Sequence, residues 1–208
     1  MYSLIIVLLV LGTFTTMVLD KLQGTGVFTL VPILIAFVPT LMDTGGNAGG
    51  QTIALMIRGL ATKEFTPKDF FKVIAKEALT ALIVSSAIFL FSFFWFLMEQ
   101  YTGIVAIDTG LLFHATENIE VLNIWKWNCW SMEFFTHAIT VAGTVSLTLF
   151  AGSFIAKIVA VCLPLTVAAL KKDPAIVAQP LLTTFVDVLS LLAYLGIATL
   201  AFKITGLI

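Results

Sequence analysis

Residues 42–51 read Met-Asp-Thr-Gly-Gly-Asn-Ala-Gly-Gly-Gln, a polar and glycine-rich segment between two strongly apolar ones. The segment contains four glycines, two amide side chains and one carboxylate; it separates the apolar run 27–41 from a second apolar stretch that begins at Ile53. In the hydrocarbon core of a membrane, such a break survives only where protein or water satisfies the exposed backbone. The segment therefore predicts a cavity or pore, and the carboxylate of Asp43 favours a positively charged visitor.

The rest of the chain has the composition of a membrane protein. Of its 208 residues, 60% are hydrophobic and 11% are charged, whereas soluble domains carry about 25% charged residues. The mean hydropathy is +1.08. The formal net charge of -1 gives no support to nucleic-acid binding, which requires clustered Lys and Arg. We therefore expect a multi-pass protein of the cell membrane, with lipid around it and no nucleic-acid partner.

Five segments are long enough to cross a bilayer, for which a helix needs roughly 20 apolar residues. They are residues 2–19, 27–60 including the polar segment, 74–98, 136–169 and 176–205. Pro32 and Pro39 give the second span two expected bend points, because proline removes a backbone donor and crowds the preceding turn. The predicted fold is an all-α membrane protein with five transmembrane helices.

The positions of Lys and Arg predict the orientation of these spans. Two connections hold most of the cations: Arg58, Lys63, Lys68, Lys72 and Lys76 lie between or beside the second and third spans, and Lys171 and Lys172 lie between the fourth and fifth. The positive-inside rule makes both connections cytoplasmic. With five spans, the N-terminus lies inside and the C-terminus outside.

Two connections carry further signals. Thr66 is typical of a helix cap, with Pro67 at the first helical position and Asp69 in the first turn. The outer loop, residues 99–135, carries three tryptophans with apolar neighbours, which suggests a segment lying in the membrane interface. No soluble domain is expected, so residues 1–208 form one transmembrane domain.

A second carboxylate, Asp187, falls inside the last predicted span. It lies about eleven residues into that span, roughly 17 Å along a helix. An aspartate there costs on the order of 2.5–3.5 kcal/mol on insertion scales, so it is expected to face the bundle interior or a wet cavity. Residues around it at three- and four-residue spacing predict one mainly polar stripe: Pro180, Thr183, Thr184, Asp187, Ser190 and Tyr194.

A purely structural role stays open for these features. Asp187 can be a buried aspartate bonded to a neighbouring helix, and the four glycines can form a small-xxx-small packing site. Packing alone does not explain Asp43, Asn47 and Gln51, whose oxygens are of the kind that hard divalent cations prefer. Lys157 falls inside the fourth span, where we expect it to pair with a carboxylate.

Two motifs carry a family resemblance. The first is the run Pro32…Pro39…Asp43-Thr-Gly-Gly-Asn-Ala-Gly-Gly-Gln51, followed by Ile57-Arg-Gly-Leu-Ala61. The second is the stretch Asp173-Pro-Ala-Ile-Val-Ala-Gln-Pro180-Leu-Leu-Thr-Thr-Phe-Val-Asp187. As a pair they closely resemble the second and last transmembrane helices of the MgtE family of divalent-cation channels and transporters. The resemblance covers essentially the whole chain, apart from the tryptophan-rich outer loop.

The resemblance implies a magnesium-transporting homodimer, whose pore lies between protomers and is lined by the second and fifth helices. It makes Asp187 the central ion-site carboxylate, with Thr183 one turn and Gln179 two turns before it. Gly46 and Asn47 contribute from the second helix. No enzyme activity and no cofactor besides the transported cation are implied, and we expect residues 1–208 not to include the family's cytoplasmic sensor domain.

Asp43 distinguishes this chain within the resemblance, because an acid at that position is not universal in the family. If Asp43 faces the path, a dimer presents four carboxylates rather than two, which favours manganese, iron or cobalt over strict magnesium selectivity. A channel-like mechanism needs no coupling ion, because two charges crossing about 100 mV gain roughly 4.6 kcal/mol. A proton- or sodium-coupled exporter is the alternative, and an intramembrane aspartic protease using both aspartates is a weaker one.

Overall fold

The computed structural model describes residues 2–31, 33–102 and 132–206, and every regular element within them is helical. In chain order these are α1 (Tyr2–Gln23), α2 (Gly26–Leu30), α3 (Ile33–Ala36), α4 (Val38–Ala61), the 3-10 turn η1 (Pro67–Asp69), α5 (Phe70–Thr102), α6 (Met132–Ala169) and α7 (Pro174–Ile204). The all-α prediction is confirmed. Most of the predicted outer loop, including its tryptophans, lies outside the described residues.

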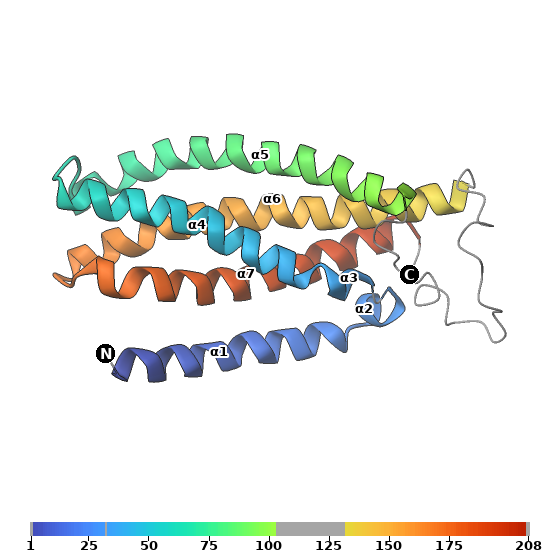
Figure 1. Cartoon of the computed structure of the whole chain (residues 1–208), viewed down its shortest axis with the longest axis horizontal. Helices are drawn as coiled ribbons and strands as arrows, with labels where there is room; N and C mark the ends of the chain where they lie inside the picture. Colours follow the sequence, from blue (N-terminus) through green and yellow to red (C-terminus); the bar gives the residue numbers. More distant parts are fainter. Residues whose placement is uncertain (1, 32, 103–131, 207–208) are drawn as a thin grey trace.

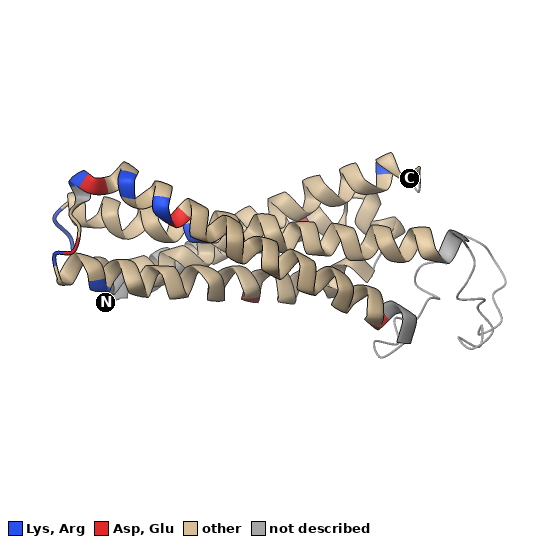
Figure 2. Cartoon of the chain, turned by 90° about the horizontal axis from the view of Figure 1, so that it is seen from above, with Lys and Arg blue, Asp and Glu red and all other residues tan. Residues whose placement is uncertain are grey.

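The long helices run side by side along one axis, with the N-terminus at one end and the C-terminus at the other (Figure 1). Among the described residues, three segments are long and apolar enough to cross a membrane: Phe70–Glu99, Phe135–Ala169 and Ala178–Ile204. Lys and Arg gather at the end that holds the connection between α4 and α5 (Figure 2). Five spans and their orientation stay predictions.

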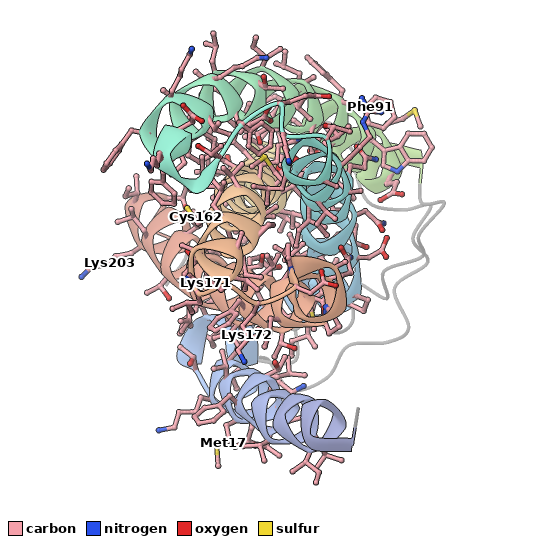
Figure 3. The ribbon with its side chains drawn as sticks, turned by 90° about the vertical axis from the view of Figure 1, so that its left-hand side faces the viewer. Met17, Phe91, Cys162, Lys171, Lys172 and Lys203 are labelled. Atoms are coloured by element: carbon pink, nitrogen blue, oxygen red, sulfur yellow. The ribbon has the colours of Figure 1, made fainter. Side chains whose placement is uncertain are left out.

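Helix α6 forms the centre of the bundle. It packs against α4, α5 and α7, while α4 and α7 also pack against each other. Helix α1 packs against α7 and, seen end-on, stands apart from the other long helices (Figure 3). This arrangement leaves one side of the α4–α7 pair without a covering helix in this protomer.

The outer surface of the bundle is largely apolar, as lipid contact requires. Leu79, Ile83 and Phe91 on α5 are 63%, 64% and 71% exposed, and the side chain of Phe91 points away from the other helices (Figure 3). A soluble protein rarely exposes so many large apolar side chains on adjoining turns. Exposed polar groups between the bundle ends are therefore exceptions that call for an explanation.

The backbone is interrupted before α4, close to the bend predicted at Pro39, and not in the glycine-rich segment. Residues 42–51 form regular helix within α4, so the prediction of exposed backbone there is wrong. The interruption falls between α2 and α4. Val31, which ends α2, has a non-helical backbone (φ -127°, ψ 69°), and α4 begins after Phe37 with Pro39 in its first turn. Proline cannot donate to the preceding turn, whereas glycines in a buried helix keep their backbone hydrogen bonds.

The interrupted segment is held by α7. The Tyr194 hydroxyl donates a 2.7 Å hydrogen bond to the backbone oxygen of Leu34, and both residues are fully buried. The Tyr194 ring also meets Phe28 edge-on, with 5.1 Å between centroids. The Leu34 carbonyl also accepts a 3.3 Å hydrogen bond from the backbone N–H of Phe37, so the Tyr194 hydroxyl is its second and shorter donor and ties α7 to the interrupted segment.

The predicted helix start at Thr66 is confirmed. The Thr66 backbone N–H and hydroxyl both donate to the Asp69 carboxylate at 2.9 Å, which completes a capping box before α5. These hydrogen bonds, with the backbone one contributing most, hold the pKa of Asp69 below its ordinary value of 3.8.

Candidate functional site

Helix α4 carries a row of exposed polar side chains. Asp43, Asn47 and Gln51 are four residues apart, so they share one face of the helix, and all three are exposed. The Asn47 side-chain N–H donates a 3.0 Å hydrogen bond to one Asp43 oxygen. The bond uses one carboxylate oxygen of Asp43 and the amide nitrogen of Asn47. The other carboxylate oxygen and the amide oxygen of Asn47 can therefore accept hydrogen bonds or contact a cation.

Helix α7 carries a second row with the same spacing. Gln179 is exposed, and Thr183 and Asp187, one and two turns further on, are half-buried. The hydroxyls of Thr183 and Thr184 donate to the Pro180 carbonyl at 3.0 and 3.3 Å. Because their protons are directed at that carbonyl, the hydroxyl oxygens can still accept hydrogen bonds or contact a cation.

The two rows lie beside each other because α4 and α7 cross in opposite directions. A Cβ placed on Gly50 would lie 3.1 Å from Nε2 of Gln179, and one on Gly46 would lie 4.0 Å from Cγ2 of Thr183. Each turn along α4 thus matches a turn back along α7. Continued by one turn, this register brings Asp187 to the level of Asp43.

In the two glycine pairs, Gly45-Gly46 and Gly49-Gly50, the first glycine of each pair allows close packing of the helices. A Cβ on Gly45 would lie 2.8 Å from Cγ1 of Val186, and a Cβ on Gly49 would lie 2.9 Å from Cδ2 of Leu182 and 3.2 Å from the Ala156 oxygen. Glycine permits this close approach of α4 to α6 and α7. The packing role that the sequence left open thus applies to Gly45 and Gly49, while Gly46 and Gly50 adjoin the polar row of α7.

The predicted polar stripe on α7 is wrong in its second half. Ser190 is 2% exposed and Tyr194 is 0% exposed, so both point into the protomer. A Cβ on Gly152 would meet the Ser190 hydroxyl at 3.0 Å and one on Gly45 would meet it at 3.4 Å, which explains why a small residue is needed there. At about 100° per residue both side chains stay within roughly 20° of the direction of Thr183. They are buried because other elements cover this part of the face: Gly45 and Gly152 lie against Ser190, and Phe28 and Leu34 lie against Tyr194.

Lys157 does not form the predicted ion pair. It is 7% exposed on α6, and its ammonium donates to the Thr52 hydroxyl at 3.3 Å. No carboxylate forms an ion pair with it in the described part of the chain. Asp43 is nine residues before Thr52 and therefore points to the opposite side of α4 from the residue that Lys157 contacts, which accounts for the failed prediction at this acid.

Two further observations define what one protomer offers. In the described ranges, no three His, Cys, Asp or Glu side chains come together to hold a metal ion. A cavity of about 370 Å³ lies elsewhere, between the end of α4 and the start of α5, and is lined partly by Arg58, Lys72 and Lys76. The polar rows are therefore an open face and not an enclosed pocket.

Comparison with known proteins decides the family. A family model described as MgtE, divalent cation transporter, matches residues 38–197, which include both polar rows. The chain belongs to the MgtE family. The magnesium transporter MgtE of Thermus thermophilus is 30% identical over 196 residues, and that of Bacillus subtilis is 29% identical over 195 residues. Each alignment covers 94% of this chain and 35% of the relative, so the chain spans about a third of those proteins.

Membership of the MgtE family confirms the resemblance inferred from the two motifs. The family is one of divalent cation transporters. This argues against the hypothesis of an intramembrane protease and agrees with the prediction that the chain is not an enzyme. Together with its apolar helices, it identifies the chain as an integral membrane protein. The roles of Asp187, Asp43, Thr183, Asn47, Gly46 and Gln179 in metal binding stay predictions.

Proposed function

We propose that the chain conducts divalent cations, Mg²⁺ in the first place, through a passage between two copies lined by the polar rows of α4 and α7. The observation that carries this proposal is the open face itself. Exposed Asp43, Asn47 and Gln179 and half-buried Asp187 interrupt an apolar surface. Lipid would penalise these groups, whereas a second copy opposing the same face would enclose them with water.

The chemistry of the rows suits a hydrated divalent ion. Mg²⁺ sheds water reluctantly and binds hard oxygen ligands. Asp187 supplies negative charge, while Thr183 and Asn47 supply neutral oxygens that accept hydrogen bonds from the ion's waters. Carboxylates that face each other across a twofold axis repel until a doubly charged ion lies between them, which favours divalent over monovalent ions.

Asp43 adds a second acid per protomer at the level of Asp187. Four carboxylates support closer binding of ions that lose water more readily, so Mn²⁺, Fe²⁺ and Co²⁺ are included in the proposed range. The names of the relatives, both magnesium transporters, support Mg²⁺ as the principal ion.

Ion flux in proteoliposomes tests the mechanism. For protein inserted with its N-terminus inside the vesicle, a membrane potential that is negative inside should drive uptake of divalent ions. No proton or sodium gradient is imposed. The competing exporter is favoured by one observation, the half-buried carboxylate of Asp187, which is also suited to relay protons. Flux that requires a pH or sodium gradient would replace the channel-like mechanism with the exporter.

Cysteine crosslinking tests the dimer. In a background with Cys129 and Cys162 replaced by serine, a cysteine at Gln51 should crosslink two copies, because this residue is exposed on the polar row of α4. A cysteine at Phe91 is the matched control, since that side chain is 71% exposed on the outer side of α5. Crosslinking at position 91 but not at position 51 would refute the proposed interface.

A further inference from the structure

Lys157 is a basic side chain enclosed by the bundle. It lies about 18 Å along α6 from the end of that helix at Ala169, well within the apolar segment Phe135–Ala169. The side chain is 7% exposed, and its hydrogen bond to the hydroxyl of Thr52 joins it to a residue that is 2% exposed. Placing a lysine inside a membrane-spanning segment costs free energy, and such residues usually have a functional role.

The position of Lys157 relates it to the polar row of α4. Its partner Thr52 directly follows Gln51, and its neighbour Ala156 has a backbone oxygen that a Cβ on Gly49 would meet at 3.2 Å. Lys157 thus lies behind α4, on the side facing α6, while Asn47 and Gln51 face away. A charge within a low-dielectric bundle acts over longer distances than one in water.

We propose that Lys157 is a fixed positive charge that weakens cation binding on the α4–α7 face and so speeds the release of the ion. This inference rests on the proposed function. Conduction requires sites that bind strongly enough for entry and weakly enough for exit. Four carboxylates in a dimer hold a divalent ion tightly, and one buried cation per protomer offsets part of that attraction without contacting the ion.

Binding and flux measured on four variants test the inference. Lys157→Met removes the charge and keeps the length of the side chain, and Lys157→Gln removes the charge but keeps a donor for Thr52. Both should lower the Kd for Mn²⁺, measured by calorimetry on protein in nanodiscs, on the order of fivefold. Both should also slow maximal uptake into proteoliposomes, because release limits it. Lys157→Arg keeps the charge and should preserve the wild-type Kd.

Thr52→Val separates charge from packing. It removes the hydrogen bond at 3.3 Å but leaves the cation in place, so thermal stability should fall while the Kd stays that of the wild type. An unchanged Kd in both charge-removing variants, or a Kd in Thr52→Val that moves with them, would overturn the inference alone. A wild-type protein that binds no divalent ion would instead overturn the proposed function and the inference with it.

Discussion

The α4–α7 pair has two unlike faces, one packed and one open. On the packed face, Gly45 and Gly49 bring α4 so close to Val186 and Leu182 that no Cβ fits without displacement. On the open face, two residues away from these glycines along the chain, the side chains of Asp43, Asn47 and Gln51 carry oxygen and charge and are left uncovered. The difference shows how one short segment meets two demands: small residues fix the helices rigidly, and the rigid pair then presents polar groups at a set spacing.

The largest expected effect is on the open face. Asp187→Ala should reduce divalent flux to background, because it removes the acid nearest the middle of α7 while deleting no packed contact of the other face. Flux is measured in proteoliposomes under an imposed voltage, with the melting temperature as the control for folding. Wild-type flux in this variant would remove Asp187 from the proposed pathway.

A pair of adjacent glycines tests the contrast between the faces directly. Gly45→Ala should destabilise the protein by about 1–3 kcal/mol, since the added Cβ would lie 2.8 Å from buried Val186. Gly46→Ala should leave stability unchanged or raise it by up to about 1 kcal/mol, because its nearest contact is 4.0 Å away and alanine favours helix. Thermal unfolding in detergent measures both. Equal losses would show that the packed face extends across both positions.

Removing the hydrogen bond from Tyr194 to Leu34 should have a moderate effect on stability. Tyr194→Phe leaves the buried Leu34 carbonyl without its 2.7 Å donor, which should cost about 1–2 kcal/mol of unfolding free energy. Thr199→Val is the control, because the hydroxyl of Thr199 is exposed and bonds only within its own helix, to Leu195. A melting temperature that falls no further in Tyr194→Phe than in the control would contradict this role.

Asp43 should affect selectivity more than rate. Asp43→Asn keeps the shape of the side chain and removes its charge, so Mn²⁺ binding should weaken several-fold more than Mg²⁺ binding, because Mg²⁺ keeps its waters and depends less on direct ligands. Calorimetry with Mn²⁺, Fe²⁺ and Mg²⁺ measures the effect. Equal weakening for all three ions would remove the argument that this acid broadens the range of ions.

The smallest effect is expected at the capping box, which lies away from both faces. Thr66→Val should cost on the order of 1 kcal/mol, or about 2–4 °C in melting temperature. The lowered pKa of Asp69 means that its charge stabilises the fold fully above pH 3.8, and that this contribution is lost as pH falls through the lowered value. Stability should therefore not vary with pH between 5 and 8 on account of Asp69, and a scan over that range checks it.

Local patterns predicted much of this structure. The apolar runs predicted the long helices, Thr66 and Asp69 predicted the cap, and the spacing around Asp187 predicted the part of the α7 row that includes Thr183. The α4 row of Asp43, Asn47 and Gln51 was not predicted, because residues 42–51 were interpreted as a break and form regular helix. The sequence failed where a partner on another helix decides the outcome. Nothing near Tyr194 in the sequence indicates that its hydroxyl donates to the Leu34 carbonyl, and nothing near Lys157 indicates that a threonine more than a hundred positions away accepts its hydrogen bond.

The alternation of packed and open positions in residues 42–51 has a consequence for how this segment can change. Each residue in a helix turns the chain by about 100°, so one residue added between Asp43 and Gly45 would exchange the roles of the positions on either side of it. Asp43 would then no longer lie on the same face as Asn47, and a residue larger than glycine would take the position of Gly45 against Val186. The length of this stretch is therefore as constrained as its composition, and single-residue insertions or deletions should be tolerated there least of all.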